Sequence, residues 1–211
     1  MSYLSHQSDS NINYVQVFAF DQLSEHSNKN AYQHFYMNSE YLSDADNIGS
    51  IEAFLDAFGL SLASYEYDAY RFDYRYRINN EVFWGDLHYA SENGQETPLS
   101  PSLDALAAIF PKRYLKNGAE FLIDEEFMLS GYYLDYALLD IVDNIFLGKQ
   151  PLPNSWEEMI NCCVDAAIAE AGKDVEYVFS YEYFLDAVAD QEYKYFEDGQ
   201  LVDSTITIFS K

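Results

Sequence analysis

The sequence predicts an α+β protein in which an antiparallel sheet with hairpins packs against several helices. Hydrophobic residues make up 49% and aromatic residues 18% of the 211 residues, enough for a large core. Segments with apolar residues at helical spacing are mixed with segments that alternate apolar and charged residues. Nothing in the pattern indicates a dinucleotide-binding fold or an internal repeat.

The first elements follow a polar N-terminus. Residues 1–13 are rich in Ser, Asn and His and predict a flexible tail, and residues 14–20 predict a short strand. Asp21 or Ser24 can cap a helix that extends to about residue 37. A second helix is expected over residues 50–58, where four apolar residues recur at helical spacing and Gly59 can end it: Ile51, Phe54, Leu55 and Phe58.

Residues 62–78 alternate with period two, which predicts a half-buried antiparallel strand. One face carries Tyr70, Phe72, Tyr74, Tyr76 and Ile78, and the other carries Arg71, Asp73, Arg75 and Arg77. Asn79-Asn80 is a plausible tight turn into a second strand over residues 81–90. The arginine face is expected to pair across strands with Asp73, Glu81 or Asp86, or else to be the one cationic feature of the surface.

The remaining elements are mainly helical. A short helix over residues 102–110 is stopped by Pro111, and residues 124–146 form a helical region broken near Gly131. Asn154 or Ser155 caps a long helix with a core face that begins at Trp156. Residues 182–190 are expected to be helical, and residues 193–196 and 201–209 form a hairpin around Asp198-Gly199.

These elements predict one domain over residues 14–211. The alternative is a subdivision near residues 112–120, because the charge changes there. Residues 1–119 carry 16 acids and 7 bases, a net of −9, whereas residues 120–211 carry 20 acids and 4 bases, a net of −16.

The formal net charge is −25, which opposes folding through self-repulsion and limits the partners. A polyanion does not bind nucleic acid or an anionic membrane through attraction to phosphates. Its natural partners are metal ions, basic peptides and the basic grooves of nucleic-acid-binding proteins. The alternative explanation is that the acids serve solubility alone, although the high aromatic content is unlike that of salt-adapted proteins.

The chain shows no apolar run long enough for a membrane span and no signal peptide at its N-terminus. Cys162 and Cys163 are adjacent in a predicted helix, where they point about 100° apart and do not favour a disulfide. These features predict a cytoplasmic protein.

The sequence does not match the known motifs for metal binding or catalysis that we compared with it. The acidic segment from Asp44 to Leu55 fails the calcium-loop pattern at Ile48 and at Leu55, and the four histidines are too scattered for a zinc site. No nucleophile elbow or phosphate-binding loop is present. We therefore expect no cofactor, no metal and no catalytic residue, while a hydrolase acting through an acid pair remains an alternative.

Acidic residues recur at helical spacing near the C-terminus. Glu182, Asp186 and Asp190 are four residues apart, so on a helix they form one stripe with about 6 Å between neighbours. Such a row can imitate the phosphates of a nucleic-acid strand, although a solvated helix face has the same pattern. Further acids are expected on other solvent faces and complete the predicted partner-binding set: Asp140, Asp143, Glu158 and Asp165.

Two segments resemble a family of small phage and prophage proteins often described as antitoxin-like. Residues 17–25, Val-Phe-Ala-Phe-Asp-Gln-Leu-Ser-Glu, are similar to the family's opening F-D-E-L-S-E-x-A-K-x-x-A. Residues 181–184 and 192–199 are similar to its acidic ending, E-Y-x-F-x-x-D-G. The resemblance spans most of the chain and carries over no catalytic residue. It implies an origin in a phage or another mobile element, and therefore the cytoplasm of a bacterial host cell as the location.

In that setting, a compact polyanion resembles the anti-CRISPR and anti-restriction inhibitors that mimic DNA. We therefore expect an acidic inhibitor that binds a basic nucleic-acid-binding defence protein, either a CRISPR effector or a restriction enzyme, and not nucleic acid itself. An antitoxin-like partner of another basic protein is the alternative function. Tyr-rich faces could also form a homodimer interface.

Overall fold

The computed structural model describes residues 2–8, 11–67, 72–92, 95–202 and 208–210, and it confirms the α+β class. The chain divides into two compact units. We call residues 1–41 and 176–211 the terminal unit and residues 42–175 the central unit. The division differs from the expected single domain with a possible break near residues 112–120, since those residues lie inside the central unit.

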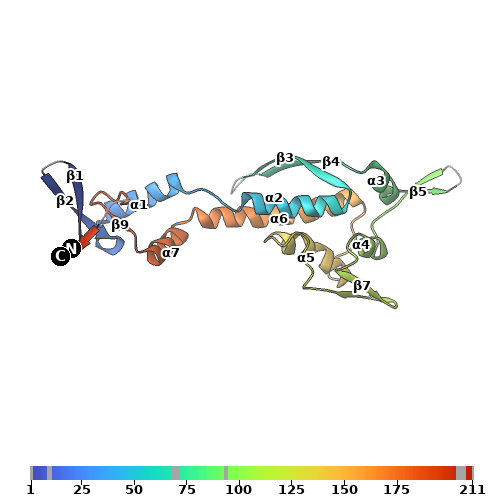
Figure 1. The fold of residues 1–211 in the computed structure, drawn as a ribbon. Helices are drawn as coiled ribbons and strands as arrows, with labels where there is room; N and C mark the ends of the chain where they lie inside the picture. Colours follow the sequence, from blue (N-terminus) through green and yellow to red (C-terminus); the bar gives the residue numbers. More distant parts are fainter. Residues whose placement is uncertain (1, 9–10, 68–71, 93–94, 203–207, 211) are drawn as a thin grey trace. The chain divides into compact units, whose positions relative to one another are not determined.

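The terminal unit contains a four-stranded antiparallel sheet (Figure 1). Its strand order is β10 (Ile208–Ser210), β1 (Ser2–Ser8), β2 (Asn11–Ala19) and β9 (Lys194–Tyr195). The flexible tail expected over residues 1–13 therefore differs from the structure, in which β1 pairs with β2 from Ser2↔Val17 to Ser8↔Asn11. Polar composition alone did not reveal this pairing, because a strand can also be stabilised by its backbone hydrogen bonds.

The other described elements of the terminal unit include two α-helices and a short 3-10 helix. A short 3-10 helix, η1 (Phe20–Gln22), leads into α1 (Glu25–Asn38), and Ser24 caps α1 by accepting a hydrogen bond from the Ser27 amide, as the sequence predicts. The helix α1 contacts α7 (Tyr181–Gln191). Buried Ala31, Phe184 and Tyr195 form a small core between them.

The expected turn at Asp198-Gly199 is present. Phe196 and Gln200 close it with a backbone hydrogen bond of 2.9 Å, and Tyr195 forms an antiparallel bridge with Leu201. Gly199 has φ +92°, and a Cβ atom there would lie 2.1 Å from the Ser27 carbonyl oxygen, so only glycine lets the turn approach α1. The predicted second hairpin strand falls partly on residues 203–207, which lie outside the described residues, while β10 pairs with β1.

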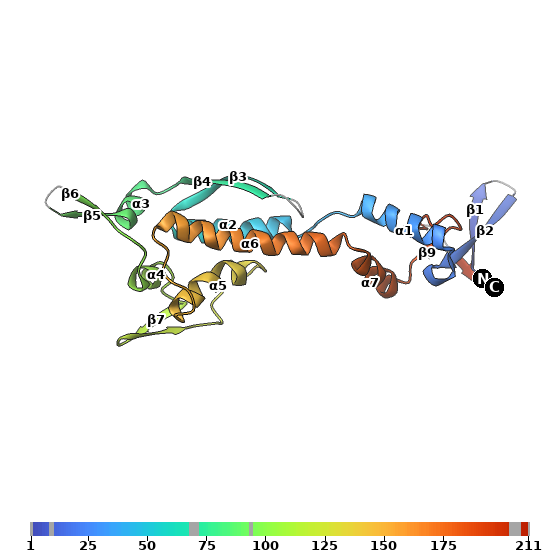
Figure 2. The same ribbon diagram turned by 180° about the vertical axis from the view of Figure 1, so that it is seen from behind.

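The central unit is built around two helices that lie side by side in both views, α2 (Asp44–Ala57) and α6 (Trp156–Val178) (Figures 1 and 2). The hairpin of β3 (Leu60–Tyr67) and β4 (Phe72–Ile78) covers one side of this pair, and α5 (Asp135–Phe146) lies on the other. The core includes Phe54, Leu138 and Trp156. The helix α2 begins at Asp44, six residues earlier than expected.

The segment after β4 corrects one prediction. Residues 81–88 form the helix α3 (Glu81–His88), not a strand, and a separate hairpin follows, β5 (Tyr89–Glu92) with β6 (Gln95–Pro98). The partner of β4 is β3, in a register that includes Tyr65↔Tyr74. Tyr70 and Arg71, which the sequence places on opposite faces of the strand, lie outside the described residues.

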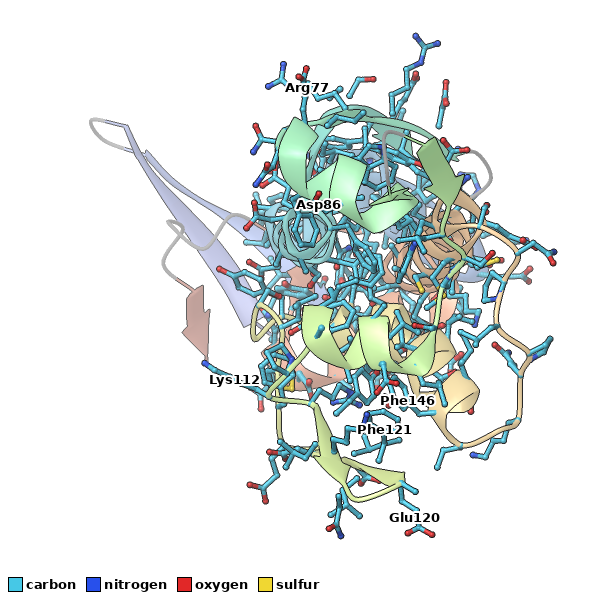
Figure 3. The ribbon with its side chains drawn as sticks, turned by 90° about the vertical axis from the view of Figure 1, so that its right-hand side faces the viewer. Arg77, Asp86, Lys112, Glu120, Phe121 and Phe146 are labelled. Carbon is cyan, nitrogen blue, oxygen red and sulfur yellow. The ribbon has the colours of Figure 1, made fainter. Side chains whose placement is uncertain are left out.

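The rest of the central unit comprises α4 (Leu103–Ile109) and the hairpin of β7 (Tyr114–Asn117) and β8 (Glu120–Ile123). Ser102 caps α4 through its side chain. The hairpin packs on α5 through aromatic rings: Tyr114 stacks on Phe146 with 3.9 Å between centroids, and Phe121 meets Phe146 edge-on at 5.0 Å. Figure 3 shows Phe121 and Phe146 close together.

The helical region expected from residue 124 begins only at Asp135. Gly131 has φ +87°, and the buried Asp135 carboxylate accepts hydrogen bonds from the amides of Ser130 (2.7 Å) and Gly131 (2.9 Å). Carboxylate and glycine together hold a turn where the sequence suggested only a break in the helix.

Candidate acidic binding surface

The two units carry the same charge density. The terminal unit has 12 acids and 3 bases, a net of −9, and the central unit has 24 acids and 8 bases, a net of −16. Divided by their lengths, both values are about −0.12 per residue. Residues 120–211, which carry the larger share of the charge, include parts of both units. Neither unit is therefore the more acidic one.

The predicted partner-binding residues fall into two groups. Glu182, Asp186 and Asp190 lie on α7 in the terminal unit. The other four lie in the central unit, two on α5 and two on α6: Asp140, Asp143, Glu158 and Asp165.

The helix α7 presents its three acids together. Ser180 caps the helix by accepting a hydrogen bond from the Tyr183 amide, and Phe184 is buried against α1. With about 100° per residue, Glu182, Asp186 and Asp190 all lie on the side of the helix opposite Phe184. All three are exposed. We call this set the α7 stripe.

The α7 stripe is electrostatically unfavourable for the helix that carries it. Like charges four residues apart destabilise a helix by a few tenths of a kcal/mol per pair, about 0.2–0.5. Glu182 lies in the first turn, where the helix dipole favours an acid, whereas Asp190 lies near the C-terminus, where the dipole disfavours one. The last turn contains no basic residue. Packing of Phe184 and the Ser180 cap therefore hold together a helix that its own charges weaken.

A tyrosine orients the middle acid of the stripe. The Tyr177 hydroxyl donates a hydrogen bond of 3.2 Å to Oδ2 of Asp186, and the Tyr177 ring meets Tyr183 edge-on at 5.4 Å. The hydrogen bond to Asp186 raises the pKa of Tyr177 further above neutral pH, as expected for a phenol that donates to a carboxylate. Sequence analysis missed Tyr177, because a tyrosine nine residues away from an acid has no recognisable spacing.

Tyrosine hydroxyls also contact acids in the central unit. Tyr65 donates to Asp44 at 3.4 Å, and Tyr133 donates to Glu170 at 3.3 Å. Lys173 also binds Glu170, and this hydrogen bond is the main reason that the pKa of Glu170 is lowered. Tyrosine hydroxyls therefore hydrogen-bond to carboxylates in both units.

The exposed acids of the central unit are more separated. Asp140 accepts a hydrogen bond from the Asn144 side chain at 2.9 Å. Glu158 accepts the Asn154 amide at 2.8 Å, so it acts as part of the N-terminal cap of α6. Asp165 lies about 10 Å further along the same helix and faces Tyr74, whose pKa is raised mainly by burial and then by this acid.

Asp143 does not belong to the acidic surface, which corrects its predicted role. Arg113 forms an ion pair with it, with Nε 2.9 Å from Oδ1, and the Tyr114 hydroxyl donates to Oδ1 at 2.7 Å. The side chains are largely buried, with 9% of Arg113 and 18% of Asp143 exposed. Arg113 also donates to the Phe127 carbonyl at 3.0 Å. The side chains of Arg113, Tyr114 and Asp143 therefore connect the start of β7, the segment after β8 and α5.

The expected cross-strand ion pairs of the arginine face are not present among the described residues. Arg75 lies opposite Ser64 and Arg77 opposite Ser61, and the Arg77 Nε donates to the Ser61 hydroxyl at 3.1 Å. Within the described ranges, no ion pair includes either arginine. Figure 3 shows Arg77 at the outer edge of the central unit, separate from Asp86 on α3.

The described residues contain no cluster of three or more His, Cys, Asp or Glu side chains that could hold a metal ion. Both cysteines are free; Cys162 is exposed and Cys163 is buried. Burial raises the pKa of the Cys163 thiol, which keeps it protonated.

The chain matches no protein-family model, no curated protein and no solved structure. In the part of the chain that the structure describes, none of the helices is both long and apolar enough to cross a membrane.

Proposed function

We propose that the protein is an acidic inhibitor that binds a basic nucleic-acid-binding protein of bacteria, such as a CRISPR effector or a restriction enzyme. Its carboxylates would occupy a groove that normally binds phosphates. The observation that carries this proposal is the α7 stripe, three exposed acids one helical turn apart on the face opposite a buried phenylalanine. The resemblance to phage and prophage proteins supports the same class of target.

Two features support mimicry of phosphates over a general solubility role. The stripe is built against the preference of its helix, since Asp190 lies at the unfavourable end of the dipole. Its central carboxylate is held by Tyr177, which reduces the conformational entropy lost on binding. A surface that served only solubility would need neither feature.

The net charge of −25 adds a long-range contribution. Attraction between this field and a basic groove accelerates association and makes the rate fall as salt screens it. Inhibition is therefore expected to weaken steeply between about 0.05 M and about 0.3 M salt.

The test compares two triple variants with the same change in net charge. One reverses the stripe, Glu182→Lys, Asp186→Lys and Asp190→Lys. The control reverses three exposed acids of α2, Asp46→Lys, Glu52→Lys and Asp56→Lys. Inhibition of a purified target enzyme is measured for both.

The proposal predicts that the stripe variant loses at least about ten-fold more affinity than the control, because direct contacts are lost in addition to net charge. Equal losses would mean that net charge alone acts. Unchanged inhibition by the stripe variant would remove α7 from the interface. Duplex DNA should displace the wild-type protein, whereas an antitoxin-like partner bound elsewhere would not respond to DNA.

A further inference from the structure

The terminal unit contains a pocket of about 350 Å³ between α1, α7 and residues 193–201. Ala31, Phe184 and Tyr195 form its floor, and each is at most 2% exposed. Phe35 and Tyr193 contribute aromatic walls. The pocket is at the lower end of the size range of ligand sites, about 300–1,000 Å³, and it suits one large side chain.

The rim contains polar side chains, among them Asn38 and Ser39, as well as the apolar Leu201. The Asn38 side chain donates to the His34 carbonyl at 2.6 Å, and Ser39 donates to the Phe35 carbonyl at 2.8 Å, so these donors are used within α1. Leu201 closes the rim and is 43% exposed. Among the described residues no Asp, Glu, Lys or Arg lines the pocket, and its floor therefore fits an uncharged, apolar group.

The surroundings of the pocket define what carries that group. Three charged residues adjoin the lining residues in the chain: Glu40 and Glu192, which are exposed, and Lys194, which lies between Tyr193 and Tyr195 and is half-buried. The terminal unit as a whole has a net charge of −9. A molecule that approaches this rim favourably is itself basic.

We propose that this pocket receives one large apolar side chain, aromatic or branched aliphatic, from a protein partner whose neighbouring residues are basic. A buried apolar floor inside a polar rim is the arrangement of an interface anchor, in which one side chain supplies much of the affinity. The inference rests on the proposed function for the identity of the partner, and it adds a site away from the α7 stripe, on the Phe184 side of α7.

The pocket itself is tested on the free protein with indole as the probe. NMR titration should shift the resonances of Ala31, Tyr193 and Leu201, with a dissociation constant in the millimolar range, as expected for so small a ligand. Leu201→Lys at the rim and Ala31→Leu at the floor should abolish these shifts. Met37→Lys is the matched control, because Met37 is 78% exposed on α1 and does not line the pocket. Absence of indole binding by the wild-type protein overturns the proposal.

The occupant is tested with the captured partner. Leu201→Lys should weaken partner binding at least about ten-fold relative to Met37→Lys, which makes the same charge change. If Leu201→Lys and Met37→Lys bind the partner equally well, the proposal is overturned, even when indole binds to the wild-type protein. This comparison does not depend on the folding of Ala31→Leu.

The same experiments distinguish this proposal from the proposed function. If reversal of the α7 stripe abolishes partner binding and Leu201→Lys does not, the proposed function is kept and the anchor pocket is rejected. If Leu201→Lys abolishes binding and reversal of the α7 stripe does not, the anchor pocket is kept and the role of the α7 stripe is rejected.

Discussion

At the residue scale, the group formed by Arg113, Asp143 and Tyr114 is the clearest structural use of an acid in this chain. Removal of one partner from a largely buried pair leaves the other charge unpaired. Arg113→Met should therefore lower the free energy of unfolding by about 3–5 kcal/mol, measured by urea denaturation. The double variant Arg113→Met with Asp143→Leu should recover part of that loss, since no isolated charge remains. A loss below about 1 kcal/mol in the single variant would show that the pair is weakly coupled to folding.

Tyr195, whose side chain is buried, should make the free energy of unfolding depend on pH in the alkaline range. Burial, and then the neighbouring Tyr193, raise the pKa of Tyr195 to about 12, above the unfolded value of about 10. Its contribution to stability is thus fully present below about pH 10 and is lost as pH rises through about 12. Over that interval the wild-type protein should lose about 2 kcal/mol relative to Tyr195→Phe, as followed by circular dichroism in urea. Parallel pH profiles of the two proteins would contradict this.

Residue chemistry explains why the candidate site was only partly predictable. The spacing of Glu182, Asp186 and Asp190 was visible in the sequence, and the structure places them on one exposed face. The spacing of Asp140 and Asp143 looked equivalent, but Asp143 is neutralised by an arginine 30 residues away. A contact of that separation leaves no local pattern, and neither does the hydrogen bond from Tyr177 to Asp186.

At the scale of elements, the charges of α7 predict opposite effects at its two ends. Asp190→Lys removes an acid from the last turn and adds a cation four residues after Asp186, so it should stabilise α7 by about 1 kcal/mol. Glu182→Lys also gains a pair with Asp186, but it places a cation in the first turn, where the dipole disfavours one, so its net effect on α7 should be smaller and unfavourable. Hydrogen exchange of the α7 amides measures both changes. Changes of the same sign at the two ends would show that the dipole does not control this helix.

Helix starts were predictable where a side chain caps the backbone, and Ser24 and Ser155, each one of two expected caps, both accept an amide hydrogen bond. The helix α3 was missed because residues 82–84, Val-Phe-Trp, favour a strand and follow an Asn-Asn pair typical of a turn. In the structure, the Asn80 side chain accepts the Phe83 amide at 3.1 Å, which is a helix cap. The same residue type serves both motifs, so local sequence could not decide between them.

At the scale of the whole molecule, folding and binding should respond to salt in opposite ways. A net charge of −25, spread evenly over both units, repels itself, and screening reduces that repulsion. The Tm should therefore rise by about 3 °C or more as NaCl increases from about 0.02 M to about 0.3 M. Binding to a basic partner should weaken over the same range. A Tm that is flat or falls with salt would mean that local ion pairs outweigh the repulsion.

The central claim is that the α7 stripe takes the place of nucleic-acid phosphates on a basic protein. The most direct test captures proteins from a bacterial lysate on the immobilised chain, elutes them with duplex DNA, and repeats the capture with Glu182→Lys, Asp186→Lys and Asp190→Lys combined. We predict that a nucleic-acid-binding protein is captured, that DNA releases it, and that the triple variant does not retain it. Partners that DNA cannot release, or that the triple variant retains equally well, would contradict the account.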